Sequence, residues 1–242
     1  MALIIRSYGR NQLLNIINLM KFENIVSDWQ KQFPILSQYT SSTLYAKADI
    51  ILIGLRLDKI MSNTYRLILE ILPLWIQEKR KISIPVFSVE LFNKKGGQFF
   101  IKYQLHEYLF EAAVECVNQQ FGLILRENIR ANDIFRLVDS FSSTLITKHN
   151  PINWHRLFEL KLALAFYSGE ADLIDTVKAE IEKETNYWNE KEFNHMFMKS
   201  IEEWKSDLYQ KMENRETIMK QVQLNMDDKK ISRLKRIHII FD

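Results

Sequence analysis

Residues 98–122, QFFIKYQLHEYLFEAAVECVNQQFG, contain the change of pattern that decides the fold. Up to about residue 105, apolar and polar residues mostly alternate, which is the period of a half-buried strand. From Tyr108 to Phe121 the apolar residues recur every three or four positions, which predicts an amphipathic helix ended by Gly122. The alternating pattern continues upstream, and the helical pattern continues almost to the C-terminus. The sequence therefore predicts an α+β fold, with a sheet in the first half and helices in the second.

Four strands are predicted in the first half. They cover residues 48–60, about 65–71, about 84–92 and 98–104. Gly54, inside the first strand, indicates a bulge or a close neighbour. The loop 93–97, NKKGG, predicts a hairpin between the last two strands, because glycine tolerates the positive φ of a tight turn. The stretch 37–43 is polar and is predicted to be a loop. Residues 12–33 have helical spacing up to Pro34, so an N-terminal helix precedes a four-stranded, mainly antiparallel sheet.

A helical C-terminal half is predicted beyond the sheet. Asn150 and Pro151 are typical of a helix start, as the N-cap and the first helical residue. The helix that follows is apolar nearly all round and closes at Gly169, so we expect it to be central and buried. The other predicted helices cover residues 132–146 and 170–186, with one long helix or two in 189–226.

The chain of 242 residues is long enough for one large domain or two small ones. The only break in the pattern lies near residues 122–131. We therefore divide the chain into residues 1–129, the helix and antiparallel sheet, and residues 130–242, the helical region, with one continuous domain as the alternative. The segment 231–241 has a pattern that fits either a late strand or a last helical turn.

The composition is that of an ordinary globular protein, with 47% hydrophobic and 26% charged residues. The net charge of +3 is small for this length and does not by itself predict binding to nucleic acid. The single cysteine, Cys116, excludes an intrachain disulfide and favours a reducing, cytoplasmic setting. No uncharged apolar run approaches the ~20 residues of a membrane span, and the N-terminus lacks the features of a signal peptide, so no membrane partner is predicted.

No motif for catalysis, metal binding or phosphate binding survives inspection. His106-Glu107 begins like the zincin motif, but Phe110 occupies the position of the second histidine. Glu192 and His195 have the spacing of a ferritin-like ligand pair, but the other helices offer no second pair. We therefore predict no catalytic residue, no metal ligand and no cofactor.

Charged surfaces supply the candidate binding residues. The helix predicted from residue 170 onward is acidic, which is ordinary for a solvated face and is also typical of a docking face for a basic partner. Lysine clusters at 79–81 with 94–95 and at 229–236 would suit phosphate contacts, although no aromatic residues interleave with them. The candidate partner-binding residues are Asp172, Asp175, Glu182, Trp188, Lys94 and Lys95.

Three functional hypotheses follow. The favoured one is a non-catalytic intracellular protein-interaction module that binds and neutralises or scaffolds a partner protein; a bacterial immunity or antitoxin-type protein fits this description by analogy of type. The second is a nucleic-acid-binding protein that uses its lysine clusters. The third is an enzyme whose site is assembled from distant residues such as His106, His155 and His195.

Overall fold

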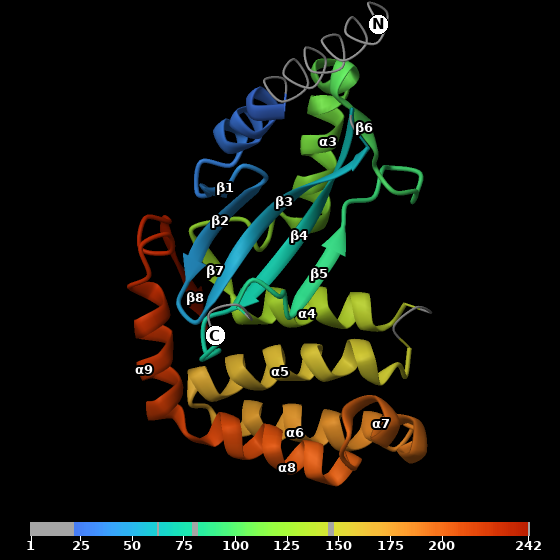
Figure 1. The fold of residues 1–242 in the computed structure, drawn as a ribbon, viewed down its shortest axis with the longest axis vertical. Coiled ribbons are helices and arrows are strands. Elements are labelled where there is room, and N and C mark those ends of the chain that lie inside the picture. Colours follow the sequence, from blue (N-terminus) through green and yellow to red (C-terminus); the bar gives the residue numbers. More distant parts are fainter. Residues whose placement is uncertain (1–21, 62, 79–81, 145–147, 242) are drawn as a thin grey trace, which may run out of the picture.

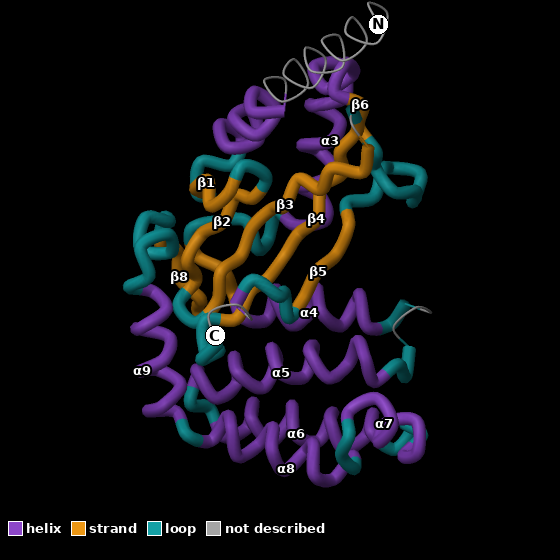
Figure 2. Tube along the Cα trace, in the orientation of Figure 1, coloured by secondary structure: helices purple, strands orange, loops and turns teal. Residues whose placement is uncertain are grey.

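The computed structural model describes residues 22–61, 63–78, 82–144 and 148–241 (Figure 1). Within them the chain forms a curled mixed sheet and a stack of helices (Figure 2), so the predicted α+β class is confirmed. Residues 22–32 are helical and agree with the end of the predicted N-terminal helix. Residues 12–21 of that prediction lie outside the described residues.

The sheet contains more strands than the four predicted. In the described residues they are β1 (Ser37–Thr40), β2 (Thr43–Ala48), β3 (Ile51–Met61), β4 (Thr64–Pro73), β5 (Phe87–Glu90), β6 (Ile101–Lys102), β7 (Asn128–Arg130) and β8 (Arg236–Ile240). The order across the sheet is β5-β4-β3-β2-β8-β7, with β1 also pairing with β2 and β6 with β4. The pairs among β1 to β6 are antiparallel, as predicted, whereas β8 is parallel to both β2 and β7.

The stretch 37–43 was predicted to be a loop, and this prediction is wrong. It contains β1 and the first residue of β2, which form a tight antiparallel pair. The hydroxyl groups of Thr40 and Thr43 are 2.7 Å apart and hydrogen-bond across the turn. The polar sequence is compatible with a strand because β1 alternates between exposed and half-buried residues and buries no full apolar face.

The hairpin predicted around 93–97 is present but short, since Phe92 and Gln98 form an isolated antiparallel bridge and Phe99 N donates to Leu91 O at 3.0 Å. Asn93 N donates to Gly97 O at 2.8 Å, and Gly96 has a positive φ of 79°. The flanking strands β5 and β6 do not pair along their length. Both pair with β4, one after the other along the same edge, because β4 has ten residues and accommodates both. The strands β5 and β6 therefore act as two parts of one edge strand beside β4, and the loop lies between these two parts.

The segment 231–241, left open by its sequence pattern, contains strand β8. Lys47 and Ala48 of β2 pair with Arg236 and Ile237 in parallel register. On its other side β8 pairs with β7. The sheet thus combines strands from both sides of the proposed boundary at 129/130. The division into residues 1–129 and 130–242 stays a prediction.

One face of the sheet is apolar and covered by helices. Tyr65 on this face hydrogen-bonds to Trp29 of the helix at 22–32 and to His106, the first residue of α3 (His106–Phe121). On the opposite face, the Tyr45 ring lies against Gly54, where an added Cβ would lie 2.8 Å from a ring carbon. The close neighbour predicted at Gly54 is therefore confirmed.

The helices of the C-terminal half lie close to their predicted positions up to residue 189, but the helix predicted over 132–146 ends at Ser142, and residues 145 and 146 of that prediction lie outside the described residues. Beyond α3 they are α4 (Ala131–Ser142), α5 (Pro151–Ser168), α6 (Ala171–Thr185), α7 (Glu190–Phe197), α8 (Ile201–Glu213) and α9 (Arg215–Met226). Residues 189–226 form three helices rather than one or two, because Met198 is left-handed with φ 57° and Asn214 leaves helical geometry to cap α9. Asn150 caps α5 by accepting from Ile152 N, as expected for an N-cap.

Helix α5 lies at the centre of the helical half. It packs between α4 and the sheet on one side and α6 and α8 on the other (Figure 1). Most of its residues from Trp154 to Ala165 are buried, so the predicted central position is confirmed. Gly169 closes the helix in the left-handed conformation with φ 78°. Helix α9 then runs back along the stack and returns the chain to the sheet.

Candidate functional site

A trough of three adjoining hollows runs along α5, where the helical stack meets the end of the sheet. The first hollow has a volume of about 410 Å³, the second about 160 Å³ and the third about 300 Å³. Ile76 and Glu159 line both the first and the second. Val86, His155 and Arg156 line both the second and the third. Because each hollow shares walls with the next, we treat them as one surface and call it the trough.

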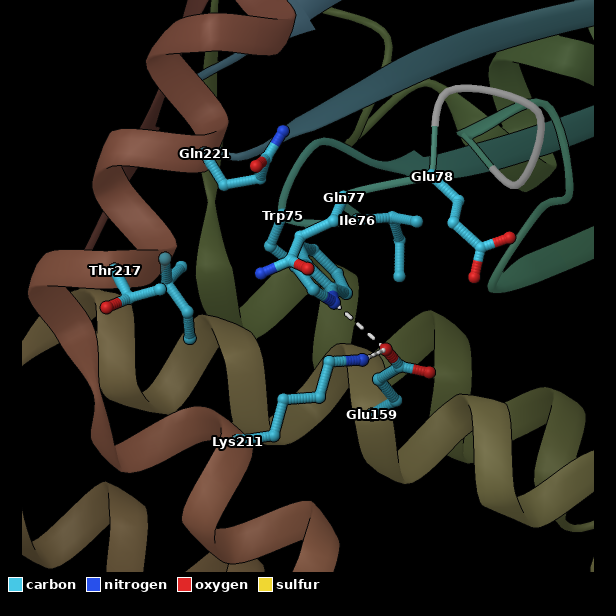
Figure 3. Close-up of a pocket in the computed structure, with 9 residues that line it drawn as sticks. Trp75, Ile76, Gln77, Glu78, Glu159, Lys211, Thr217 and Gln221 are labelled. Atoms are coloured by element: carbon cyan, nitrogen blue, oxygen red, sulfur yellow. Dashed lines mark hydrogen bonds and ion pairs between the residues drawn. The ribbon is translucent and has the colours of Figure 1, made fainter.

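The first hollow is enclosed by the segment after β4, by α5 and by the helices α8 and α9 (Figure 3). Glu159 of α5 points toward it and accepts two hydrogen bonds at the same oxygen, from Trp75 Nε1 at 2.9 Å and from Lys211 Nζ at 2.6 Å. Thr217 and Gln221 of α9 form the opposite wall. The Glu159 carboxylate and the Lys211 ammonium group are thus paired with each other, and Glu78 adds a second carboxylate to the lining of the hollow.

The second and third hollows share His155 and Arg156. The Nδ1 atom of His155 lies 3.1 Å from the Pro151 carbonyl oxygen, so Nδ1 carries the proton and Nε2 remains the acceptor. Burial lowers the pKa of His155, and the ring is neutral at neutral pH. Arg156 Nη1 donates to the carbonyl oxygen of Pro85 at 2.9 Å. This hydrogen bond ties α5 to the segment that leads into β5.

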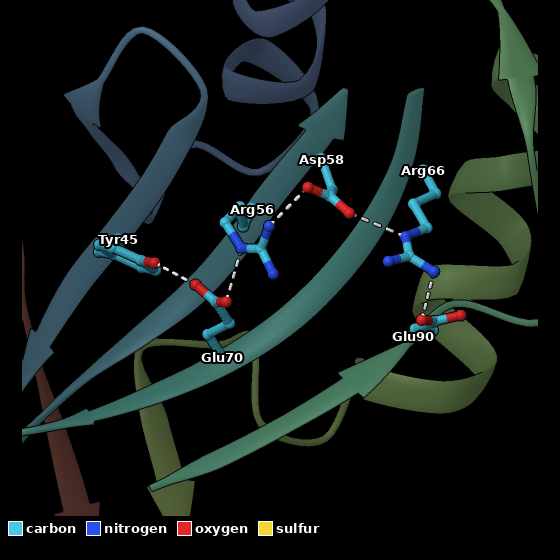
Figure 4. Close-up of polar contacts among 6 residues, drawn as sticks. All are labelled: Tyr45, Arg56, Asp58, Arg66, Glu70 and Glu90. Carbon is cyan, nitrogen blue, oxygen red and sulfur yellow. Dashed lines mark hydrogen bonds and ion pairs between the residues drawn. The ribbon is translucent and has the colours of Figure 1, made fainter. Parts of the chain in front are cut away.

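A charged ladder crosses the polar face of the sheet (Figure 4). It consists of Tyr45, Glu70, Arg56, Asp58, Arg66 and Glu90, from four adjacent strands. Arg56 donates to Glu70 at 2.6 Å and to Asp58 at 2.7 Å. Arg66 then links Asp58, at 2.9 Å, to Glu90 on β5. Burial, and secondarily the Glu70 carboxylate, raises the pKa of Tyr45, so its hydroxyl stays a donor.

The charged groups of the ladder pair with one another, and among its atoms in the described residues Oε2 of Glu90 is buried without a hydrogen-bond partner. Acidic and basic groups alternate along it, and each charged group has at least one opposite partner among the described residues. A catalytic pair needs a group that is available to exchange a proton with a substrate. The ladder instead crosslinks β2, β3, β4 and β5, and it holds the edge strand β5 in place.

The predicted acidic residues lie on one helix. Asp172 and Asp175 are exposed on α6. Glu182, two turns further on, is already engaged within the chain, because Lys205 Nζ donates to it at 2.6 Å and Tyr209 Oη at 3.0 Å. The three carboxylates therefore share a helix, but one of them is part of the contact between α6 and α8.

The other predicted residues lie apart from this face. Trp188 is only 7% exposed and stacks against Phe193, which leaves little of its side chain for a partner. Lys94 pairs with Glu115 of α3 at 2.6 Å, and Lys95 is exposed in the loop between β5 and β6. Residues 79–81, the other part of this predicted basic cluster, lie outside the described residues. Nothing in these positions tests whether a partner binds there.

The three histidines of the enzyme hypothesis are separated. His106 is buried and bonded to Tyr65, His155 lines the trough, and His195 is exposed on α7. Neither the three hollows of the trough nor a fourth hollow beside Pro34 and Lys235 contains two of them. The described part of the chain also contains no group of three or more His, Cys, Asp or Glu side chains arranged to hold a metal ion.

Apart from His155, sequence reasoning missed the residues that form the trough. Trp75, Glu159 and Lys211 come from the end of the sheet, α5 and α8, and no local motif connects them. The one available signal was the presence of His155, Arg156 and Glu159 within the mostly apolar helix α5, which indicates a side of that helix not covered by the core.

Among the described residues, no helix is both long enough and apolar enough to cross a membrane. Comparison of the chain with known protein families, with curated proteins and with solved structures finds no match.

Proposed function

We propose that the protein is a non-catalytic protein-interaction module and that its partner binds in the trough. The observation that carries the proposal is the continuity of the three hollows along α5. A small-molecule site is usually a single concave pocket with a few convergent polar groups. In the first hollow of the trough, Glu159, Trp75 and Lys211 bind one another instead.

The lining of the trough suits a polypeptide. Ile84 and Ile152 are 43% and 53% exposed, although both line hollows, and charged side chains of both signs lie between them. Protein interfaces combine such an apolar centre with a polar rim. From Ile152 to Glu159 helix α5 advances by about 10 Å at 1.5 Å per residue. That length matches about three residues of an extended chain.

The alternatives use other surfaces. A nucleic acid would need unpaired cations along a groove, and Lys94 is already paired with Glu115. A basic protein partner would instead contact the acidic face of α6, through Asp172 and Asp175. Each alternative therefore predicts that substitutions outside the trough weaken binding.

The test is to isolate the partner and then to map its binding. Affinity capture from a native lysate at low and high salt, followed by reconstitution with the purified partner, should give a stoichiometric complex that survives high salt. The double variant Ile84→Asp/Ile152→Asp places charges in the trough at exposed positions. We expect it to weaken binding at least about tenfold, or ~1.4 kcal/mol. Leu224→Asp is the matched control, because Leu224 is 58% exposed on α9 and does not line the trough.

Two results would contradict the proposal. A complex that the trough variant leaves intact and that Asp172→Lys/Asp175→Lys disrupts would move the interface to α6. Captured nucleic acid that washes off with salt, and that Lys94→Glu/Lys95→Glu no longer retains, would replace the protein partner altogether.

A further inference from the structure

Strand β5 ends the sheet on one side and presents an open edge (Figure 1). Leu91, just beyond it, donates its backbone N–H to a carbonyl of β4 at 3.0 Å. Backbone groups along a strand point alternately to its two sides. The backbone N–H and C=O groups of Phe87 and Val89 therefore point toward β4. Those of Ser88 and Glu90 point away from the sheet. No hydrogen bond from another described residue reaches these outward groups.

The third hollow of the trough lies beside this edge. Phe87 and Ser88 form one wall, and Phe141, Ile152 and Leu157 from α4 and α5 contribute to the other. An edge strand with free backbone groups is a template for pairing with a further strand. Here the template has an apolar groove at its side, which supplies contacts for every second side chain of an added strand.

Arg156 places a positive charge at the same hollow. Its Nη1 atom is fixed by the Pro85 carbonyl oxygen, and no carboxylate of the described residues forms an ion pair with it. A guanidinium group has five N–H donors, so donors remain for a carboxylate in bidentate geometry. The charge of the groove therefore favours an acidic group on whatever binds beside β5.

The edge strand is also held in a fixed position. Glu90 is bound to Arg66 at the end of the charged ladder, and Phe87 packs edge-on against Phe141 with ring centroids 5.4 Å apart. A template that is already ordered loses little conformational entropy when a partner strand is added, which favours binding.

We infer that an extended segment of the partner polypeptide adds to β5 as a further strand and places a carboxylate against Arg156. This inference rests on the proposed function and specifies how the same trough is used. The charge of Arg156 identifies the occupant as an acidic peptide segment. A second copy of this chain is a separate outcome of the test.

The probe is a display library of random peptides of about eight residues, which is the length of an ordinary strand. We expect selected peptides to be rich in β-branched residues and to share one acidic position. Ser88→Pro removes the outward N–H without breaking the pairing with β4, since that N–H does not face β4. It should lower the affinity of the selected peptides at least about tenfold. Ser88→Ala is the matched control and should bind as the wild type does.

Arg156→Gln tests the charge. In the wild type, replacing the shared acid of a selected peptide by its amide should weaken binding, and in Arg156→Gln the acid and the amide should bind equally. Amide hydrogen exchange at Ser88 and Glu90 should slow when a peptide binds to the wild-type protein. Thermal denaturation of each variant establishes that it is folded.

Each other outcome overturns the inference in a recognisable way. Failure to select any peptide, or equal binding by Ser88→Pro and wild type, excludes strand addition. If the whole partner needs Ile84 and Ile152 but tolerates Ser88→Pro, the proposed function stands and only the inference fails. If neither the Ile84→Asp/Ile152→Asp variant nor Ser88→Pro weakens binding of the whole partner, the proposed function and the inference both fail. A wild-type dimer that Ser88→Pro converts to a monomer makes a second copy the occupant of the edge.

Discussion

A single buried lysine joins three helices of this protein. The side chain of Lys161 on α5 is 4% exposed, and its ammonium group binds Asp139 of α4 and Glu180 of α6. The two carboxylates are 54% and 33% exposed. The desolvation cost therefore falls mainly on the lysine, and this asymmetry decides what each substitution does.

Removing the two carboxylate charges should lower the free energy of unfolding more than removing the lysine does. Asp139→Asn/Glu180→Gln leaves the Lys161 ammonium group buried with neutral amide acceptors and no counter-charge, and we expect the free energy of unfolding to fall by about 3–5 kcal/mol. Lys161→Met keeps the length of the side chain and leaves two carboxylates that water can reach, so we expect a loss below about 1.5 kcal/mol. Urea denaturation measures the free energy of unfolding of both variants. An equal loss in the two variants would contradict this account.

His106 is held in one tautomer by its neighbours. Trp29 Nε1 donates to the Tyr65 hydroxyl at 3.2 Å, and an indole N–H can only donate. The Tyr65 hydroxyl therefore gives its own proton to Nδ1 of His106 at 2.8 Å. The imidazole proton is then on Nε2, which faces Asp28 at 3.4 Å. Burial lowers the pKa of His106, and Asp28 opposes this effect only in part.

This histidine makes stability depend on pH. Because the folded pKa of His106 lies below its ordinary value of about 6.5, the unfolded chain binds more protons than the folded chain once the pH falls below that value. We expect the free energy of unfolding to be insensitive to this group above about pH 7 and to decrease as the pH falls through about 6. Burial also lowers the pKa of His155, so this residue likewise makes the free energy of unfolding decrease as the pH falls.

Urea unfolding at several pH values checks this expectation. His106→Gln should flatten the pH dependence, because the amide oxygen still accepts from Tyr65 and no longer titrates. His195→Gln on the exposed face of α7 is the control and should leave the dependence unchanged. A stability that rises on acidification through this range would show that the sign is wrong.

At the scale of the elements, β8 depends on one side chain at the end of β2. The Asp49 carboxylate accepts the backbone N–H of Ile239 at 2.7 Å, which extends the pairing beyond the last residue of β2. Asp49 is 7% exposed and has a positive φ of 47°. Asp and Asn tolerate that conformation better than most residues do.

Asp49→Ala should therefore loosen the C-terminal strand. It leaves the buried Ile239 N–H without an acceptor, and we expect a loss of about 1–3 kcal/mol in the free energy of unfolding. Asp49→Asn keeps an acceptor and the tolerated backbone conformation, so it should retain most of the stability. Amide hydrogen exchange at Ile239 reports directly on the strand. Unchanged protection in the alanine variant would exclude this role for Asp49.

At the scale of the whole molecule, the sheet and the helical stack share their contacts. Asn225 of α9 donates to the carbonyl oxygens of Leu74 and Ile76 at 2.7 and 2.8 Å. Glu159 binds Trp75, and β8 joins the far end of the chain to β2. The buried apolar residues of both halves form one cluster.

We therefore expect the protein to unfold in one cooperative transition. The five tryptophans can be replaced by 5-fluorotryptophan and followed separately by fluorine NMR during urea titration. Trp29 in the helix at 22–32 and Trp204 in α8 should show the same midpoint. Two midpoints would instead establish separate domains on the two sides of residue 129.

The sequence by itself determined the fold class and the positions of several elements, but it did not predict β1, β2 or β7 as strands. Residues 51–61 and 151–168 were recognised because the period of apolar residues records which face of a strand or helix is buried, and because Asn150 and Gly169 act on their own helix ends. These are local properties, so neighbouring residues are sufficient to reveal them.

Only the tertiary structure decided what lies against each face. The contact between Asp49 and Ile239 joins residues 190 positions apart, and the walls of the trough come from a loop, a strand and four helices. The open edge of β5 likewise depends on β6 pairing with β4 instead of β5. Periodicity states that a face is buried and leaves its neighbour unspecified, because packing partners are chosen by the whole chain in three dimensions.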